Sequence, residues 1–260
     1  MQSRGEQHGA GDMFDRAGDH HPTFSPGGSD PGLRHGVSQP GARRSYARKG
    51  VSDRKGQVTA AVDTWPGNGG GLATQAKGPA GRPGILLDRD GTVIVDHGYV
   101  GSVDRVEFID GAAAAIAGFN QAGIPVAVVT NQSGVARGLY GIDDVEAVHR
   151  YIADQLAEYG AHVDMFAYCP YHPEGTVGAF ARSSEDRKPR PGMAMAAQAA
   201  LNLDLAASWV VGDRPEDMGL AEVVGASAIY LGPDRPPRPG VWSYPTLAAA
   251  APFIVERIAI

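Results

Sequence analysis

Residues 84–92, with the sequence GILLDRDGT, contain the pattern that decides the fold. Three consecutive aliphatic residues (85–87) lead directly into Asp88, and Asp90 follows two positions later. A short, fully apolar run that stops at acidic residues is typical of a parallel strand buried on both faces of a sheet. We therefore predict a buried strand over 84–87, with both aspartates at its carboxyl end.

Downstream of this strand, apolar runs of strand length alternate with stretches that carry helical spacing or helix-end signals. Asp110 is expected to cap the first helix, and Pro191 to open the third in the first helical position, where proline is favoured. The expected strands are 84–87, 124–130, 163–169, 209–211 and 227–231, and the expected helices are 112–122, 143 to about 158, 191–201 and 215–224. This alternation predicts a Rossmann-like α/β fold, a parallel sheet with helices on both faces.

Polar residues follow the predicted strands at the points where ligands bind such sheets, beyond the carboxyl ends. The second strand ends in Thr130-Asn131-Gln132-Ser133-Gly134, and the fourth ends in Gly212-Asp213-Arg214-Pro215-Glu216-Asp217. The segment RKPR (187–190) precedes the third helix. We expect these acidic, hydroxyl and basic groups to converge on one edge of the sheet.

Asp88 and Asp90 are two positions apart at a strand end, so their side chains point the same way and repel each other. A divalent cation would neutralise this repulsion, and oxygen ligands from Asp88, Asp90 and Asp213 suit Mg²⁺. One aspartate could then attack phosphorus to form an aspartyl-phosphate, while the other protonates the leaving alkoxide. The alternative, in which these acids only cap helices and turns, explains a single aspartate but not all of them together.

Lys188 stands out because it is the only lysine between 83 and 260, a segment with eleven arginines. A chain that prefers arginine but places one lysine here suggests that a compact point charge is required. We expect Lys188 to hold a phosphoryl oxygen and to offset the charge of Asp88. The alternative is a surface lysine with no special function.

Residues 1–82 differ in composition from the rest of the chain. They hold 17 of the 36 glycines, have no isoleucine and carry a net charge of 11 − 7 = +4, whereas 83–260 carry 12 − 22 = −10. With so few strong hydrophobes, burial cannot offset the entropy of ordering this segment. We therefore predict a disordered N-terminal tail over 1–82 and one folded domain over 83–260. The basic tail could contact nucleic acid or an acidic partner, or it could be a solvated extension without function.

The composition excludes several classes of protein. No run of 18 apolar residues is present, so no membrane span is expected, and no apolar stretch suggests a secretory signal. Cys169, the single cysteine, excludes an intramolecular disulfide and fits a reducing cytoplasm. The negative charge of the folded domain argues against nucleic acid as its main partner.

The motifs resemble those of the haloacid dehalogenase (HAD) superfamily of phosphohydrolases. The matching stretches are LLDRDGTVIVDHGYV (86–100), VEFIDGA (106–112), VVTNQSGVARG (128–138), CPYHPEG (169–175), RKPRPGM (187–193) and VGDRPEDM (211–218). Within the superfamily they are most similar to the heptose-1,7-bisphosphate 7-phosphatase and histidinol-phosphatase family. This resemblance implies a HAD fold with a small flap after the first strand and no large cap domain.

The resemblance also implies roles for individual residues. Asp88 would be the nucleophile and Asp90 the general acid and base. Mg²⁺ would be held by the side chains of Asp88 and Asp213 and by the carbonyl of Asp90. Thr130 and Lys188 would stabilise the phosphoryl group. The residues expected to bind substrate are Arg89, Asp96, His97, Gly98, Tyr99, Asn131, Gln132, Ser133, Arg137, Arg187 and Arg214. The alternative for Arg137 is a surface arginine at a helix start.

One part of the chain departs from the family pattern. The family usually binds a structural zinc through Cys-x-His and a later Cys-x-Cys. Cys169 matches the first ligand, but Tyr171, Ser184 and Asp186 occupy the other three positions. We therefore expect no zinc site of the usual kind, although Cys169, His172 and Asp186 could in principle hold a metal.

The leading functional hypothesis is a Mg²⁺-dependent phosphatase that acts on C7 of a heptose bisphosphate in nucleotide-activated heptose biosynthesis. The alternatives are a histidinol-phosphatase or a broad small-molecule phosphatase, a nucleic-acid 3′-phosphatase, and a regulatory pseudo-phosphatase. The charge of the domain opposes the nucleic-acid enzyme, and the intact aspartates and lysine oppose the pseudo-phosphatase. We expect a cytoplasmic monomer whose partner is a small sugar bisphosphate, with neither nucleic acid nor membrane.

Overall fold

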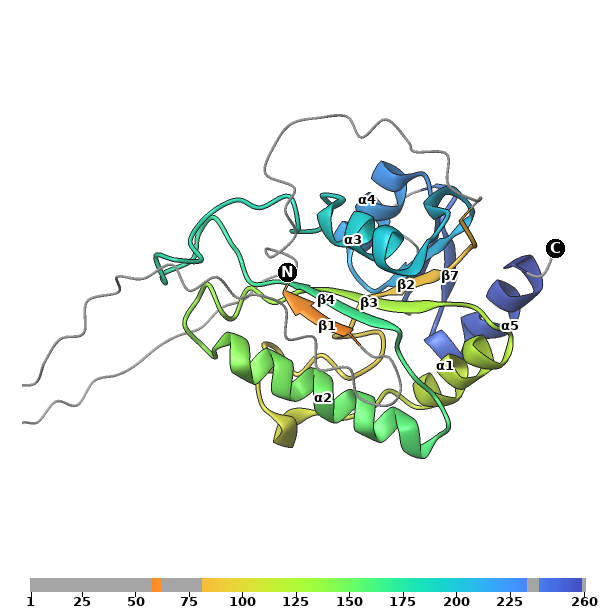
Figure 1. Ribbon diagram of the computed structural model, residues 1–260, viewed down its shortest axis with the longest axis horizontal. Helices are drawn as coiled ribbons and strands as arrows, with labels where there is room; N and C mark the ends of the chain where they lie inside the picture. The colour runs from red at the N-terminus through yellow and green to blue at the C-terminus, as the bar shows by residue number, and fades with distance from the viewer. Residues whose placement is uncertain (1–57, 62–80, 233–238, 259–260) are drawn as a thin grey trace, which may run out of the picture. The chain divides into compact units, whose positions relative to one another are not determined.

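The computed structural model describes residues 58–61, 81–232 and 239–258 of the chain. These residues form a seven-stranded sheet in the order β1-β4-β3-β2-β5-β6-β7, and every neighbouring pair is parallel (Figure 1). The strands are β1 (Val58–Ala61), β2 (Ile85–Leu87), β3 (Val126–Asn131), β4 (Met165–Cys169), β5 (Trp209–Gly212), β6 (Ser227–Leu231) and β7 (Trp242–Tyr244). The predicted parallel α/β architecture is confirmed.

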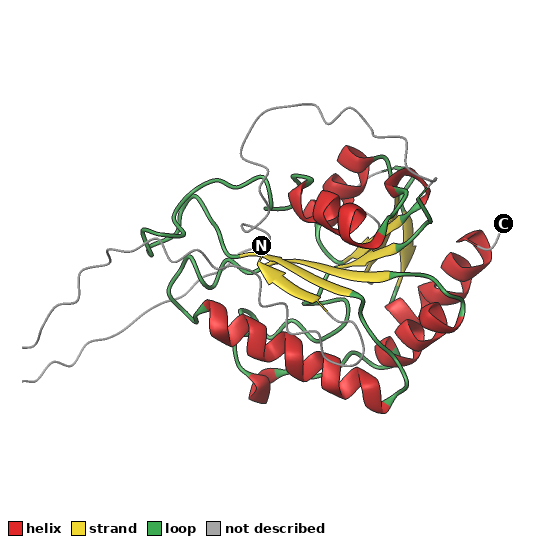
Figure 2. Ribbon diagram, viewed as in Figure 1, coloured by secondary structure: helices red, strands yellow, loops and turns green. Residues whose placement is uncertain are grey.

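Helices cover both faces of the sheet (Figure 2). Residues of α1, α2 and α5 pack in one apolar cluster, and residues of α3 and α4 pack in a second cluster on the opposite face. The helices are α1 (Ala112–Gln121), α2 (Ile142–Glu158), α3 (Gly192–Leu201), α4 (Pro215–Val224) and α5 (Leu247–Ile258), with short 3₁₀ turns η2 (Val103–Arg105) and η3 (Leu205–Ala207). Alternate residues of the central strands face the two clusters, which explains why those strands are apolar throughout.

The register of the central strands positions the site. Leu87, the last residue of β2, lies opposite Val128 of β3 on one side and Val211 of β5 on the other. The three strands therefore reach the same edge of the sheet within a few residues of one another. Asp88 follows β2 there, and its backbone amide donates to the carbonyl oxygen of Val211 at 2.9 Å.

A small flap, residues 93–109, follows β2. It folds back on itself, because Ile94 bridges Phe108 and the amide of Val95 donates to the carbonyl oxygen of Glu107 at 2.8 Å. Arg105 in η2 donates to the carbonyl oxygens of residues 97, 98 and 99 and so fixes the tip of the flap. The predicted small flap is present.

The predicted element bounds hold to within about two residues, but two predicted helix starts are wrong and two elements after β6 were missed. Asp110 does not cap α1: the helix begins after Gly111, which has a φ of 74° and makes no side-chain cap. Pro191 is the N-cap of α3 rather than its first helical residue. The strand β7 and the helix α5 were not predicted. The strand is only three residues long, and Pro252 lies inside the helix, where proline is normally disfavoured.

Most of the predicted tail over 1–82 lies outside the described residues. Within it, the structure describes β1, which pairs with β4 at one edge of the sheet. These four residues form a strand, whereas the prediction had the whole of 1–82 disordered. Arg82 also belongs to the folded part, since its amide donates to the carbonyl oxygen of Asn202 at 3.0 Å. Among the described residues, no helix has both the length and the apolar character needed to cross a bilayer.

His149 lies fully buried in α2, where its ring stacks on Phe166 with the ring centroids 4.8 Å apart. Neither ring nitrogen has a hydrogen-bond partner among the described residues. Burial holds the pKa of His149 well below its ordinary value of 6.5, and the positive charges of Arg89 and Arg150 lower it further. His149 is therefore neutral in the folded chain.

We expect the free energy of unfolding of His149→Phe to depend less on pH in the acidic range than that of the wild type. Below about pH 6.5 this imidazole is protonated in the unfolded chain but not in the folded chain. The free energy of unfolding of the wild type therefore falls by about 1.4 kcal/mol for each pH unit, until the pKa of His149 in the folded state is reached. Urea denaturation at about pH 7.5 and about pH 5.5 measures the difference. Equal pH dependence in the wild type and His149→Phe would contradict this account.

Candidate active site

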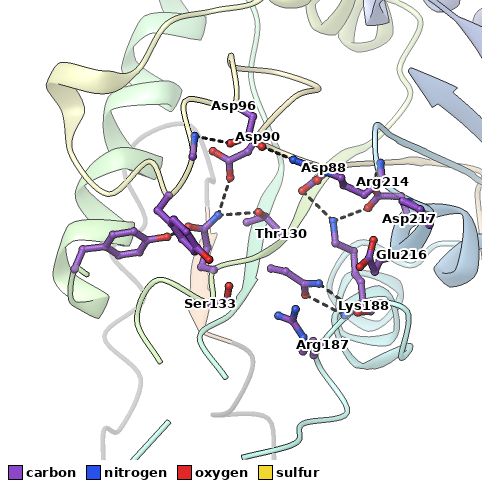
Figure 3. Close-up of a pocket in the computed structure, with 16 residues that line it drawn as sticks. Asp88, Asp90, Asp96, Thr130, Ser133, Arg187, Lys188, Arg214, Glu216 and Asp217 are labelled. Carbon is purple, nitrogen blue, oxygen red and sulfur yellow. Dashed lines mark hydrogen bonds and ion pairs between the residues drawn. The ribbon is translucent and has the colours of Figure 1, made fainter. Parts of the chain in front are cut away.

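A pocket of about 520 Å³ lies at the carboxyl edge of the sheet (Figure 3). Its walls come from the residues after β2, the flap, the residues after β3, the loop before α3 and the first turn of α4. The lining residues are Asp88, Asp90, Asp96, Gly98, Tyr99, Thr130, Asn131, Gln132, Ser133, Tyr140, Arg187, Lys188, Arg214, Pro215, Glu216 and Asp217. A cavity of this size suits a small-molecule ligand.

Lys188 is buried between two carboxylates at the base of the pocket. Its ammonium nitrogen lies 2.9 Å from Asp88 Oδ1 and 2.6 Å from Asp217 Oδ1, and it donates to the carbonyl oxygen of Val129 at 2.8 Å. Burial alone would lower the pKa of Lys188, but Asp217 and Asp88 outweigh it and raise the pKa. Lys188 is therefore a fixed positive charge in contact with Asp88, which rules out the surface-lysine alternative.

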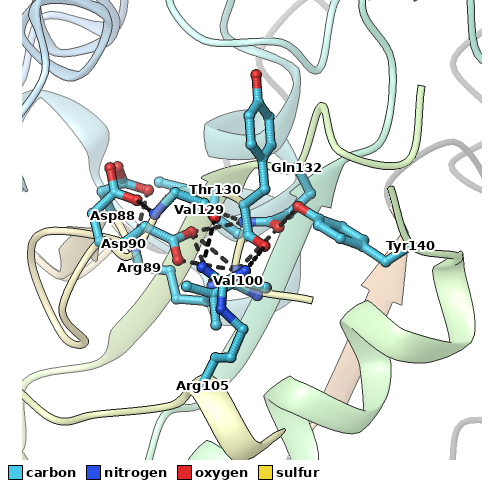
Figure 4. A network of polar contacts seen from close by, with 12 residues as sticks. Asp88, Arg89, Asp90, Val100, Arg105, Val129, Thr130, Gln132 and Tyr140 are labelled. Carbon is cyan, nitrogen blue, oxygen red and sulfur yellow. Dashed lines mark hydrogen bonds and ion pairs between the residues drawn. The ribbon is translucent and has the colours of Figure 1, made fainter. Parts of the chain in front are cut away.

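Asp90 is held by a polar network beneath the pocket (Figure 4). The guanidinium of Arg89 donates to both of its carboxylate oxygens at 3.1 Å, and Gln132 Nε2 donates to Oδ2 at 2.9 Å. Burial raises the pKa of Asp90; the charge of Arg89 opposes this rise, and the charge of Asp88 adds to it. Two donors thus orient the Asp90 carboxylate, and its raised pKa favours the protonated form that a general acid needs.

Asp213 provides the third carboxylate of the site. Carboxylate oxygens of Asp88, Asp213 and Asp217 lie within 4.8 Å of one another, the kind of group that can hold a cation. Asp213 Oδ1 is buried and has no hydrogen-bond partner among the described residues. Burial raises the pKa of Asp213 to about 6, and the neighbouring charge of Asp88 contributes. A side chain at Gly91 would collide with this carboxylate, so glycine is required there.

Hydrogen bonds join the end of β3 to the loop before α3. The side chain of Asn131 accepts from the amide of Lys188 at 3.0 Å and donates to the carbonyl oxygen of Lys188 at 3.2 Å. Thr130, which is 1% exposed, accepts from Gln132 Nε2 at 2.9 Å. These contacts fix Thr130 and Lys188 on the same side of the pocket.

Two arginines and the tip of the flap form the outer part of the pocket. Arg214 lies 2.6 Å from Asp96 Oδ2 of the flap and 3.4 Å from Asp213 Oδ2. Asp96 also accepts from the amide of Gly98, and Tyr99 has a φ of 55°, an uncommon conformation for a residue other than glycine. Arg187 lines the pocket near Lys188. The pocket therefore holds two guanidinium groups besides Lys188, and that of Arg214 is paired with Asp96 and Asp213.

The structure brings most of the predicted site residues together, but three predicted substrate contacts do not line the pocket. Arg89 is fully buried beneath Asp90 and binds protein groups instead. His97 points to Glu107, with Nε2 2.8 Å from Oε2, and Arg137 is not among the lining residues. Tyr140 is a pocket residue absent from the prediction, whereas Pro215, Glu216 and Asp217 were expected at this edge after the fourth strand but without an assigned role.

Comparison with known proteins places this geometry in a family. A family model described as HAD-hydrolase-like matches residues 186–232. A D-glycero-beta-D-manno-heptose-1,7-bisphosphate 7-phosphatase of Yersinia pestis is 44% identical over 149 residues, covering 56% of this chain and 79% of the relative. The protein of the same name from Escherichia coli K12 is 45% identical over 139 residues, covering 54% and 73%. The chain belongs to the heptose-bisphosphate phosphatase family of the HAD superfamily.

Two solved structures agree with this assignment. A HAD-like phosphatase from Mesorhizobium loti matches with a TM-score of 0.63 and 36% identity, covering 69% of this chain and 87% of that one. A D,D-heptose 1,7-bisphosphate phosphatase from B. bronchiseptica, solved with magnesium and phosphate, matches with a TM-score of 0.59 and 31% identity, covering 67% and 98%. The family fold thus corresponds to the sheet and helices described above.

The loop that departs from the family's zinc pattern is held by other contacts. The guanidinium of Arg182 lies over the ring of Tyr171, 3.7 Å from its centroid, and Phe180 packs against the same ring. Cys169 is buried, and burial raises the pKa of its thiol to about 11. Ser184 Oγ accepts from the amide of Asp186 at 3.1 Å. The residues at the four zinc-ligand positions therefore take part in packing and hydrogen bonding.

Lys188→Met should destabilise the fold by about 3 kcal/mol, because it leaves Asp88 and the buried Asp217 facing each other without a cation. Adding Asp217→Asn should recover at least half of this loss, since it removes one of the two unpaired charges. Urea unfolding of both variants measures the effect. The control Arg150→Met, which breaks an exposed pair with Glu146, should cost less than about 1 kcal/mol. A double variant no more stable than Lys188→Met would contradict this role.

Proposed function

We propose that the protein hydrolyses the C7 phosphate of D-glycero-D-manno-heptose 1,7-bisphosphate through an aspartyl-phosphate on Asp88. The observation that carries the proposal is Asp88 at the base of the pocket, in contact with Lys188 and beside the donor-held Asp90. The relatives named for this reaction share more than 40% identity with the chain over most of their length. The volume of the pocket suits a small sugar bisphosphate as the partner. The one buried thiol is compatible with a reducing cytoplasm.

In the first step a carboxylate oxygen of Asp88 attacks the phosphorus atom of the C7 phosphate. The bond between phosphorus and the C7 oxygen breaks, and Asp90 gives its proton to the leaving oxygen. In the second step water attacks the phosphorus of the aspartyl-phosphate and loses a proton to Asp90. This step releases inorganic phosphate and restores both aspartates. The raised pKa of Asp90 supports its role as proton donor in the first step. The contacts with Arg89 and Gln132 orient Asp90 both as the donor and as the later proton acceptor.

The residues at the site fit Mg²⁺. The donor set is made of oxygens, and the unpartnered Asp213 Oδ1 is a free ligand atom. Both oxygens of Asp217 are already used, one by Lys188 and one by the amide of Arg214, so Asp217 is less suited than Asp213. We infer that the side chains of Asp88 and Asp213 and the carbonyl of Asp90 hold the metal. When bound, Mg²⁺ supplies positive charge that offsets the phosphoryl oxygens near Asp88.

The remaining charges of the pocket suit a second phosphate. Lys188 and Thr130 lie beside Asp88, where they would stabilise the phosphoryl group in transfer. Arg187 and Arg214 line the outer pocket, and the guanidinium fork matches a phosphate group. A sugar that carries two phosphates would therefore find further cations in the pocket besides Lys188. Asp96, Gly98, Tyr99, Asn131 and Ser133 also line the pocket and would contact the sugar.

A phosphate-release panel tests this function. The substrates are both anomers of the heptose 1,7-bisphosphate, histidinol phosphate and fructose bisphosphate. We expect the highest kcat/KM with a heptose bisphosphate, loss of activity with EDTA and recovery on adding Mg²⁺ alone. A preference for histidinol phosphate, or similar kcat/KM values for all substrates, would point to the histidinol or broad phosphatases of the same family. No phosphate release from any substrate would refute the proposal and favour a pseudo-phosphatase.

Asp88→Asn should abolish turnover while the fold remains, because an amide does not attack phosphorus. The loss should reach several powers of ten in kcat, each worth about 1.4 kcal/mol of transition-state stabilisation. Thermal unfolding checks the fold, and steady-state phosphate release checks the rate. Activity within tenfold of the wild type would remove Asp88 from the role of nucleophile.

A further inference from the structure

Tyr140 lies where the flap meets the segment after β3, and neither the sequence motifs nor the proposed chemistry gives it a role. It lines the pocket, and its ring fits against two glycines, Gly101 of the flap and Gly134 after β3. A side-chain carbon at either glycine would collide with atoms of the Tyr140 side chain. The position of this ring is therefore tied to both the flap and the site.

The hydroxyl of Tyr140 points at the network beneath the pocket (Figure 4). It donates to Gln132 Oε1 at 2.8 Å. Burial raises the pKa of Tyr140 to about 12; the charge of Arg89 lowers it, and that of Asp90 raises it. The hydroxyl therefore keeps its proton at physiological pH and acts as a donor toward Gln132.

The side-chain amide of Gln132 uses all four of its hydrogen-bonding positions. Nε2 donates to Asp90 Oδ2 and to Thr130 Oγ1, each at 2.9 Å. Oε1 accepts from Arg89 Nη2 at 3.0 Å and from Tyr140. Because a guanidinium can only donate, the atom that faces Arg89 must be the oxygen, and the amide has one satisfactory orientation. That orientation aims its N–H groups at Asp90 and Thr130.

We propose that Tyr140 is a positioning residue for catalysis, which acts through Gln132 to hold Asp90 in the orientation that transfers a proton to the leaving group. The proposal rests on the proposed phosphatase function. Tyr140 itself has no contact with the attacking or leaving oxygen in this scheme. Its hydroxyl supplies one of the two donors that keep Gln132 Oε1 turned away from Asp90, and its ring links this arrangement to the flap.

Loss of the hydroxyl should therefore affect proton transfer more than binding. Without it, Arg89 alone holds Gln132 Oε1, and the amide can rotate so that its N–H no longer reaches Asp90. The step that suffers is the one in which the phosphorus–oxygen bond breaks and Asp90 gives its proton to an alkoxide. A phenolate such as p-nitrophenolate leaves without that proton, so its release depends less on the orientation of Asp90.

The test compares wild type and Tyr140→Phe on two substrates, the best sugar phosphate of the panel and p-nitrophenyl phosphate, with Mg²⁺ present. The measured quantity is kcat/KM, which covers the steps through phosphoryl transfer. We expect about a tenfold loss for the sugar phosphate and less than about a twofold loss for p-nitrophenyl phosphate. Tyr159→Phe, at an exposed tyrosine at the end of α2, is the matched control and should change neither value.

A second measurement separates positioning from a general loss of structure. If Tyr140 acts through Gln132, then adding Tyr140→Phe to a Gln132→Met variant should cost almost nothing further in kcat/KM. Equal losses on both substrates, additive losses in the double variant, or no loss in Tyr140→Phe would each overturn this inference while the proposed function stands. A wild type inactive on both substrates would overturn the proposed function, and this inference with it.

Discussion

The site depends on one buried cation held between two carboxylates. Asp88 directly follows β2 and Asp217 lies in α4, far apart in sequence, and Lys188 lies between them in sequence, in the loop before α3. Without that charge, the carboxylates buried at this edge of the sheet would face one another unpaired and would destabilise the fold. The ammonium also reaches the carbonyl oxygen of Val129 in β3, so it joins three segments of chain at the point where the central strands end.

Small residues beside the aspartates make this arrangement possible. A side chain at Gly91 would strike the carboxylate of Asp213, and one at Gly212 would strike that of Asp217. The two glycines let the acidic side chains approach the backbone closely, which brings them within reach of Lys188 and of one another. The close packing of the site aspartates around Lys188 therefore depends on Gly91 and Gly212, because a larger residue at either glycine would displace a carboxylate.

The sequence predicted the framework because burial on both faces leaves apolar runs that are easy to recognise, and because motif order fixes which strand ends carry acids. It failed where tertiary structure overrides local signals. Gly111 in a left-handed conformation displaced Asp110 from the helix cap, and the helix α5 continues through Pro252. The strand β1 lies in a segment too poor in hydrophobes to predict.

The same reasoning applies to the site. Lys188 was found because a lone lysine among arginines is a chemical signal, and the structure buries it against Asp88. Arg89 was misplaced although the signal was present: if Asp88 and Asp90 point into the pocket, the residue between them points away from it. Asp217 was expected at this edge because it follows the fourth strand, but its pairing with Lys188 has no sequence signal, and neither has the position of Tyr140 at the pocket.

The ion pair between Arg214 and Asp96 has a consequence for which molecules the pocket accepts. The flap carboxylate already occupies this guanidinium, so an incoming anion must compete with a resident one. A phosphate dianion carries more charge and more acceptor oxygens than a carboxylate and can win that competition, whereas a neutral sugar or a weak monoanion cannot. Binding of an anion to Arg214 is thus an exchange of one anion for another, which links the position of the flap to the charge of the ligand.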